Sequence, residues 1–83
     1  MKLVYFAWVR ERIGRPEEVL DPPPEVTTVA ELVGWLRGRG EEYAYAFENE
    51  GVVRAAVDRV HAKPDTALAG AAEVAFFPPM TGG

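Results

Sequence analysis

The end of the chain holds the residues whose type and spacing point most directly to chemistry. The sequence closes with AFFPPMTGG, residues 75–83, so that its last two residues are Gly82 and Gly83. Because glycine has no side chain and adopts many backbone angles, a carboxylate at the end of this pair can enter a narrow channel in another protein. A frayed chain end is the simpler interpretation, and the rest of the sequence has to decide between the two.

Chemical use of a terminal carboxylate requires a second protein. A carboxylate is a poor electrophile, and adenylation with ATP converts it to a reactive acyl-adenylate. The acyl-adenylate of Gly83 accepts sulfur to form a thiocarboxylate, or an amine to form an isopeptide. The residues of the tail leave both outcomes open.

Two prolines before the tail predict how it leaves the domain. Pro78 and Pro79 cannot donate to a β-ladder and favour an extended exit. They predict a folded domain over residues 1–77 and a flexible, extended Gly-Gly tail over residues 78–83. Such a tail reaches roughly 20 Å when fully extended, which suits insertion into a partner's pocket.

Other groups that could do chemistry are scarce. The chain has no cysteine and no serine, which removes thiol and serine nucleophiles and thiolate metal ligands. His61 is the only histidine, so we expect no metal site, and no glycine-rich phosphate loop is present. We interpret the neighbouring carboxylates as solvated surface groups; they are Glu17-Glu18, Glu41-Glu42 and Glu48-Asn49-Glu50.

Length and charge restrict the class of protein further. With 83 residues the chain forms one domain with a single modest core. The net charge is -4 and the arginines and lysines are scattered, which disfavours nucleic-acid binding. No segment is long enough to cross a bilayer, so we expect no membrane partner. The N-terminus begins directly with strand-like residues, and we expect a cytoplasmic protein without a signal peptide.

The first part of the chain predicts an antiparallel hairpin. KLVYFAW, residues 2–8, is almost continuously apolar, which predicts a central strand covered on both faces. Residues 10–14 are expected to form a turn or one helical turn, and residues 17–20 to return as the second strand. The prolines within residues 21–25 exclude a paired central strand there.

A helix is predicted after this connector. Thr28 and Glu31 have the spacing of a capping box, and Gly38 is typical of a helix end. Gly34 inside the helix costs about 1 kcal/mol relative to alanine, and we interpret it as a sign of close approach between helix and sheet. The apolar stripe of this helix consists of Val29, Leu32, Val33 and Leu36.

The remaining elements complete an α+β pattern. Residues 41–48 predict a short second helix, and residues 52–57, 60–62 and 73–77 predict strands. We expect a tight turn at Asp58-Arg59 and Leu68 in the core. Alternation along the last strand places Val74 and Phe76 on one face and Ala75 and Phe77 on the other. The ubiquitin-like β-grasp is the simplest fold with this order, a mixed sheet of about five strands with one main helix packed across it.

Over essentially its whole length the sequence resembles the MoaD-like sulfur carriers, the small subunits of molybdopterin synthase. The resemblance is carried by VYFAWVRERIG, TTVAELVGWL, VVRAAVD and, above all, the closing EVAFFPPMTGG. Thiamine sulfur carriers and ubiquitin-like modifiers share the Gly-Gly end but generally lack the Phe-Phe-Pro-Pro approach. The sequence departs from the family at Asp58, where asparagine is common, and at AGAAEV, which replaces a more acidic turn.

This resemblance implies a chemical role for the tail. A ubiquitin-activating-like adenylyltransferase would use ATP to adenylate Gly83, and a persulfide donor would supply the sulfur of a C-terminal thiocarboxylate. The large synthase subunit would then receive the tail in its active site and take sulfur for cyclic pyranopterin monophosphate, forming molybdopterin. The residues inserted there would be Pro79, Met80, Thr81 and Gly82. The family also implies a heterotetramer, no bound cofactor and no catalytic side chain in this chain.

By matched position, the resemblance implies that Phe6, His61 and Phe77 dock against the large subunit. Core packing is the alternative for Phe6 and Phe77, and His61 stands where an apolar docking residue is expected. Other functions stay open at this point. They are a sulfur carrier for thiazole synthesis or tRNA thiolation, a modifier joined to lysines through Gly83, and an interaction module whose tail is inert.

Overall fold

The computed structural model describes residues 1–49 and 51–79 of the chain. Its elements are β1 (Lys2–Tyr5), α1 (Ala7–Ile13), β2 (Glu17–Val19), α2 (Val29–Arg37), α3 (Glu41–Ala46), β3 (Arg54–Val57), β4 (Val60–Ala62) and β5 (Glu73–Phe77). The predicted tail is described only as far as Pro79. The prediction that residues 78–83 are flexible and extended therefore falls mostly outside the described residues.

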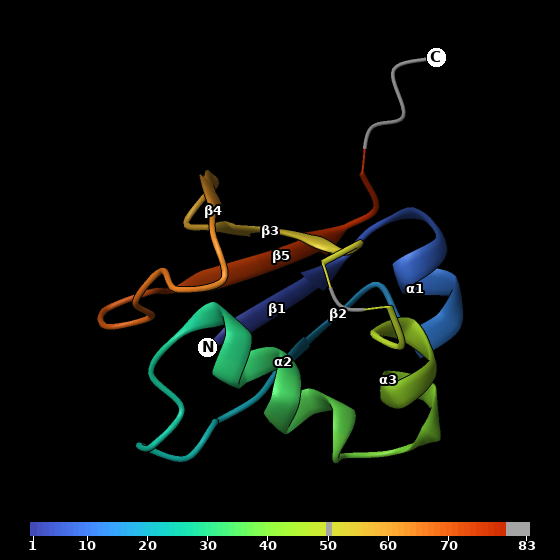
Figure 1. The fold of residues 1–83 in the computed structure, drawn as a ribbon, viewed down its shortest axis with the longest axis horizontal. Coiled ribbons are helices and arrows are strands. Elements are labelled where there is room, and N and C mark those ends of the chain that lie inside the picture. Colours follow the sequence, from blue (N-terminus) through green and yellow to red (C-terminus); the bar gives the residue numbers. More distant parts are fainter. Residues whose placement is uncertain (50, 80–83) are drawn as a thin grey trace.

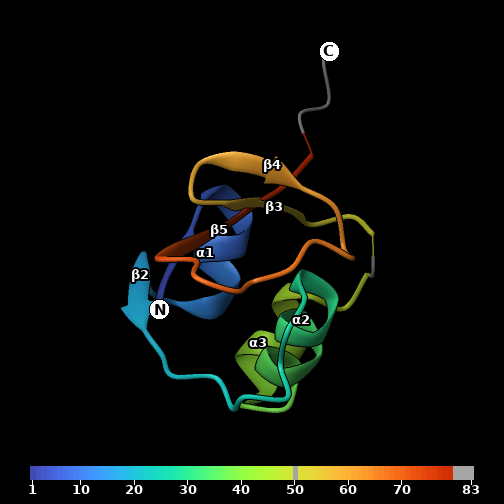
Figure 2. The same cartoon turned by 90° about the vertical axis from the view of Figure 1, so that its left-hand side faces the viewer.

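The strands form one mixed sheet with the order β2-β1-β5-β3-β4. β1 and β5 run parallel at its centre, and β2 and β3 pair antiparallel with them on either side (Figure 1). Helices α2 and α3 lie together on one side of this sheet (Figure 2). The arrangement confirms the predicted ubiquitin-like β-grasp fold of α+β type.

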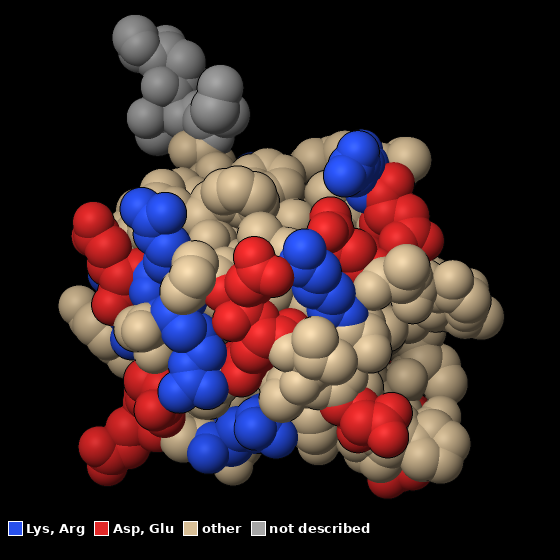
Figure 3. All heavy atoms as spheres, turned by 180° about the vertical axis from the view of Figure 1, so that it is seen from behind, with Lys and Arg blue, Asp and Glu red and all other residues tan. Residues whose placement is uncertain are grey.

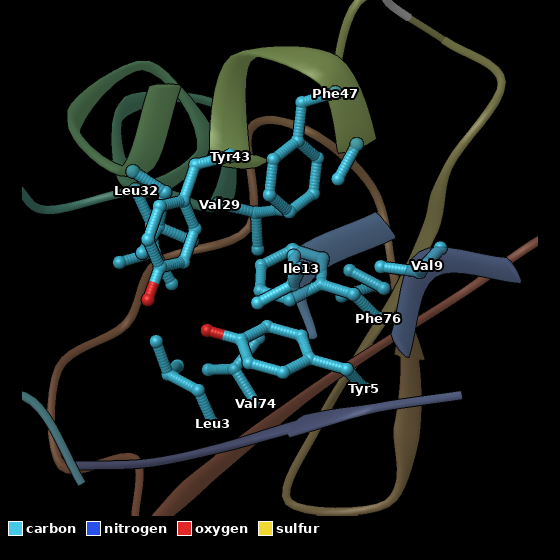
Figure 4. Packing of buried hydrophobic residues seen from close by; sticks show 14 of the residues in the cluster. Leu3, Tyr5, Val9, Ile13, Val29, Leu32, Tyr43, Phe47, Val74 and Phe76 are labelled. Atoms are coloured by element: carbon cyan, nitrogen blue, oxygen red, sulfur yellow. The ribbon is translucent and has the colours of Figure 1, made fainter. Parts of the chain in front are cut away.

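The core lies between the sheet and the helices. Strand residues Leu3, Val74 and Phe76 are at most 1% exposed, and Leu68 is buried from the loop after β4, as predicted. Figure 4 shows Phe76 near the middle of this cluster. Its ring centroid lies 6.3 Å from that of Tyr5 and 5.1 Å from that of Phe47, the latter in an edge-on contact. These aromatic pairs join β1 and β5 to the helical layer, and such pairs add stability beyond their buried area.

The opening segment differs from its prediction. β1 ends at Tyr5, and Trp8 lies in the seven-residue helix α1 rather than in a strand. The helix begins at Ala7, whose φ is 51°, and ends at Ile13; Gly14 follows it in the left-handed conformation that commonly closes helices. Val9 and Ile13, one helical turn apart, are both buried. Because a short apolar run fits a buried helix as well as a strand, the pattern alone did not separate the two.

The prediction that the first strand is covered on both faces is also wrong, because only one face of β1 is buried. Leu3 and Tyr5 point into the core, whereas Lys2 is exposed and Val4 is only half-buried. The described helices cover one face of the sheet. The opposite face, around Val4, has no helix among the described elements over it.

Helix α2 confirms the predicted capping box but not the interpretation of its glycine. The Thr28 hydroxyl accepts from the Glu31 amide at 3.2 Å, and Glu31 accepts from the Thr28 amide at 3.1 Å. Gly34 is exposed, and a Cβ built there would meet no atom within 4 Å. Close helix–sheet approach therefore does not explain this glycine.

The β3–β4 hairpin begins two residues later than predicted, at Arg54, and turns at Asp58-Arg59 as expected. Both turn residues have positive φ, 47° and 69°, as tight hairpin turns require. One Asp58 carboxylate oxygen also accepts from the amides of Ala72 and Glu73 at 3.0 and 2.9 Å. The Asp58 side chain therefore connects the β3–β4 turn to the turn before β5.

Candidate functional site

The base of the tail is held at the centre of the sheet. β5 pairs on one side with β1, through the positions Tyr5 and Phe76, and on the other with β3, up to the pair of Arg54 and Phe77. Pairing then stops at Pro78, as predicted from its missing donor. The predicted reactive residue Gly83 and the predicted inserted residues Met80, Thr81 and Gly82 lie outside the described residues. Pro79 is described and is half-buried.

Next to this base, the open face of the sheet carries small apolar side chains and His61, with Arg54 paired opposite Phe77. Its register places Val4, Ala75, Ala56 and His61 in one row across four strands. Phe77 belongs to the same face, and its ring lies 6.2 Å from the His61 ring, tilted by 59°. The structure therefore brings together two of the three predicted docking residues, from β4 and β5.

Phe6 completes this group at the end of β1. Its amide donates to the Phe76 carbonyl at 3.0 Å, which continues the parallel register so that Phe6 comes beside Phe77. The Phe6 side chain is 48% exposed, and its backbone is still extended before the turn at Ala7. Core packing does not account for Phe6, which is exposed, or for Phe77, which is half-buried. We call Phe6, His61 and Phe77 the aromatic patch.

Phe6 is the last extended residue before the chain turns into α1. Ala7 has a positive φ, a conformation that costs a residue with a Cβ roughly 1–2 kcal/mol. The turn sends the chain into α1, so that the strand stops immediately after Phe6. Local strain of this kind is commonly stored beside functional surfaces.

Charges on the surface are mixed rather than gathered by sign. Figure 3 shows acidic and basic side chains interspersed on the side opposite the view of Figure 1, with uncharged areas between them. In residues 1–49 and 51–79 no helix is long and apolar enough to cross a membrane. Within the same residues, no three histidine, cysteine, aspartate or glutamate side chains lie together as metal ligands.

Glu18 contradicts the prediction that the neighbouring carboxylates of the sequence are solvated surface groups. Glu18 has a side chain only 10% exposed, and its Oε2 accepts from the hydroxyls of Tyr43 at 2.6 Å and Tyr5 at 2.7 Å. Arg15 donates to its other oxygen at 3.0 Å. Burial opposes the charged form, but the hydrogen bonds from Tyr43, Tyr5 and Arg15 outweigh it and lower the pKa of Glu18. Burial, reinforced by Glu18, raises the pKa of both tyrosines.

The sequence contained one signal that could have identified this group. Alternation in the strand 17–20 places Glu18 on the face opposite Glu17, and the register pairs Glu18 with buried Leu3. A carboxylate on the core face needs donors, and the two tyrosines supply them. The cluster joins β1, β2 and α3, which makes it a structural element rather than part of the tail's chemistry.

Comparison with known proteins gives consistent results along the chain. The sequence pattern of the ThiS family matches residues 3–83. The molybdopterin synthase sulfur carrier subunit of Escherichia coli (strain K12) is 35% identical over 83 residues, which is 100% of this chain and 99% of that protein. The protein of the same name from Haemophilus influenzae is 29% identical with the same coverage.

Solved structures support the fold. A structure assigned as molybdopterin converting factor, subunit 1, from Pyrococcus furiosus aligns with a TM-score of 0.73 and 30% identity over 95% of each chain. The crystal structure of SAMP1 from Haloferax volcanii aligns with the same TM-score at 24% identity, covering 100% of this chain and 98% of that one. At that identity the likeness concerns the fold alone. Because the family pattern and a relative above 30% identity both extend to the last residue, the chain belongs to the ThiS family.

Proposed function

We propose that this chain is the sulfur carrier of molybdopterin synthase and that its chemistry takes place at the carboxylate of Gly83. The observation that carries the proposal is the end-to-end match to a protein named as that carrier, at 35% identity. The described structure is compatible with it, because β5 ends beside an exposed aromatic patch and leads directly into the Pro-Pro-Met-Thr-Gly-Gly sequence.

The proposed reaction begins with activation. The Gly83 carboxylate attacks the α-phosphorus of ATP within an adenylyltransferase, and pyrophosphate leaves. A persulfide sulfur then attacks the acyl carbon and releases AMP, which gives an acyl disulfide. A thiol reduces this disulfide by two electrons and leaves the thiocarboxylate. Transfer of that sulfur to cyclic pyranopterin monophosphate, with water supplying the oxygen that replaces it, returns Gly83 to a carboxylate. ATP is thus a substrate of the activating enzyme, and no cofactor is assigned to this chain.

The aromatic patch is the proposed docking surface for the large synthase subunit. Phe77 directly precedes the tail, and Phe6 and His61 lie beside Phe77, so docking there would direct residues 79–82 into the partner's active site. Exposed aromatic side chains bury much area with little loss of conformational entropy, which is why they dominate many interfaces. In this proposal the large subunit supplies the catalytic side chains, and two carriers join a dimer of large subunits in a heterotetramer.

Intact-mass measurement tests the terminal chemistry. The purified chain is incubated with the activating enzyme, ATP and a sulfur source, and we expect a mass gain equal to the exchange of one oxygen for one sulfur. A chain lacking Gly83 should show no exchange while its circular dichroism spectrum is unchanged. Exposed Glu25, with Glu25→Gln, gives a control that should be thiolated normally.

Three results would contradict the proposal in distinct ways. Lysine-linked products without thiocarboxylate would identify a protein modifier, and an unchanged mass with enzyme of proven activity would indicate an inert tail. Normal thiolation combined with no conversion of precursor by the chain and the large subunit would assign the carrier to another sulfur pathway, such as thiazole synthesis or tRNA thiolation.

A further inference from the structure

Phe6 joins two elements, and each of them fixes one side of its backbone. Its amide donates to the Phe76 carbonyl at 3.0 Å, which holds Phe6 to the sheet. Its carbonyl accepts from the amides of Val9 at 3.1 Å and Arg10 at 3.3 Å, which belong to the first turns of α1. The direction of the exposed Phe6 side chain therefore depends on how α1 is placed relative to β1.

Helix α1 has few features that would stabilise it on its own. It has seven residues, its N-cap residue Phe6 makes no side-chain capping bond, and its first turn contains no acidic residue. Isolated helices this short are not stable in water. The helix also begins at Ala7 with a φ of 51°, and strain of this kind persists only where the surrounding structure holds it. Contacts with other elements must therefore keep α1 in place.

Arg12 makes directional contacts between α1 and α3, which lie side by side (Figure 1). Its guanidinium carbon lies 4.5 Å from the centre of the Trp8 ring on α1 and 4.2 Å from the centre of the Tyr45 ring on α3. Its Nη1 donates to the Tyr45 carbonyl at 3.2 Å and to Glu48 Oε1 at 3.4 Å. We call Trp8, Arg12, Tyr45 and Glu48 the Arg12 stack.

The Arg12 stack adds an orientation that burial does not supply. Val9 and Ile13 anchor α1 in the core, but the burial of aliphatic side chains is non-directional. A planar guanidinium that lies over two rings and donates to two oxygens restricts rotation and sliding of the helix. The Arg12 side chain is only 27% exposed, so salt screens its contacts less than those of a fully exposed pair.

We propose that Arg12 is a positioning residue for docking. The Arg12 stack holds α1 against α3, maintains the strained turn at Ala7, and thereby fixes the direction in which Phe6 is presented to a partner. Arg12 acts through α1 rather than by contact with that partner. The inference rests on the proposed function, because that function gives Phe6 its docking role.

Amide hydrogen exchange of the free, full-length chain tests the structural step without a partner. Arg12→Ala should speed exchange at Val9 and Arg10, whose amides donate to Phe6, by about fivefold, because the lost cation–π contacts no longer oppose local opening of α1. Exchange in β5 should not change. Faster exchange confined to α1 is the result expected if the Arg12 stack holds this helix.

Arg39→Ala is the matched control. The Arg39 guanidinium carbon also lies near two rings, 5.1 Å from the centre of Trp35 on α2 and 5.8 Å from the centre of Tyr43 on α3. The substitution therefore removes the same kind of contact at a place that does not involve α1. Exchange at Val9 and Arg10 should stay as in the parent chain.

Calorimetry with the large synthase subunit tests the consequence for docking. Arg12→Ala should raise the dissociation constant about fivefold, whereas Arg39→Ala should bind like the parent chain. Adding Ala7→Gly to Arg12→Ala should restore most of the affinity, because glycine adopts positive φ without strain. Adding Gly34→Ala instead should stabilise α2 but leave the affinity low, since α2 does not hold Phe6.

The contrary outcomes separate this inference from the function on which it rests. Unchanged exchange at Val9 and Arg10 in Arg12→Ala would overturn the positioning role, even if affinity fell, because Arg12 would then contact the partner directly. Equal losses of affinity in Arg12→Ala and Arg39→Ala, or equal recovery with Ala7→Gly and Gly34→Ala, would reduce the effect to general stability and also overturn it. Failure of the parent chain to bind the large subunit would contradict the proposed function, whereas faster exchange in Arg12→Ala would still support the placement of Phe6 by Arg12.

Discussion

Replacing Glu18 by glutamine should destabilise the protein, although its neighbour Glu17 should tolerate the same change. Glu18 accepts from two tyrosine hydroxyls, and the residues that carry them are at most 3% exposed. Hydrogen bonds to a charged partner contribute about 1.5–3 kcal/mol each, against about 1 kcal/mol for neutral pairs. Glutamine keeps an acceptor oxygen but loses the charge, so we expect a loss of about 1–3 kcal/mol.

Glu18→Ala should cost more than Glu18→Gln. Alanine removes the acceptor and leaves two buried hydroxyls without a partner, at about 1–3 kcal/mol each. Glu17 makes an exposed ion pair with Lys2 at 3.3 Å, and pairs of this kind contribute about 0–1 kcal/mol. Urea unfolding of the two Glu18 variants and Glu17→Gln, followed by circular dichroism, gives the comparison directly.

The pH dependence provides an independent check. The folded state lowers the pKa of Glu18 below 4.5, so its contribution is complete above that pH and is lost as the pH falls through the folded pKa. The stability difference between the parent chain and Glu18→Gln should therefore be large at pH 7 and shrink in acid. A difference that does not change between pH 7 and pH 3, or equal losses for Glu17→Gln and Glu18→Gln, would refute the role assigned to this cluster.

Three further changes follow from local geometry. Burial raises the pKa of Tyr5 and Tyr43 above 10.0, so the stability that depends on their neutral forms should be complete below pH 10 and decline above it. Urea unfolding at pH 9 and pH 11 should show a smaller decline in stability for Tyr43→Phe than for the parent chain. Thr28→Ala removes the capping hydroxyl and should cost about 1 kcal/mol, seen as a lower urea midpoint, whereas no change would contradict the cap. Gly34→Ala should raise stability by up to about 1 kcal/mol, because nothing obstructs the new Cβ; a lower melting temperature would contradict that geometry.

The sequence predicted best those elements whose ends have chemical markers. Helix α2 follows its capping box and apolar stripe, and the β3–β4 hairpin follows its two-residue turn. The run of residues 2–8 carried no such marker. Its division at Phe6 depends on Val9 and Ile13 packing into the same core as β1, and a tertiary preference of this kind is not visible in the local pattern.

The candidate site was partly predictable for the same reason. Alternation along β5 fixed the faces of Phe76 and Phe77, and the structure confirms both. The buried role of Glu18 depends on the register of β2 against β1, and register is a relation between strands rather than a property of either one.

The position of β5 fits the proposed role of the tail, because this strand is attached to the middle of the sheet. A tail that follows an edge strand is attached to the sheet through hydrogen bonds to a single neighbouring strand. Tension on such a tail can break these hydrogen bonds one after another, starting at the end of the strand. β5 is held by two ladders, from β1 and β3, and Phe76 on its core face is packed against Tyr5 and Phe47. Pro78 ends the pairing at a fixed residue, so force on the tail reaches the middle of the sheet rather than its edge. In the proposed function, the chain after that proline would enter a partner while the aromatic patch beside it stays in place.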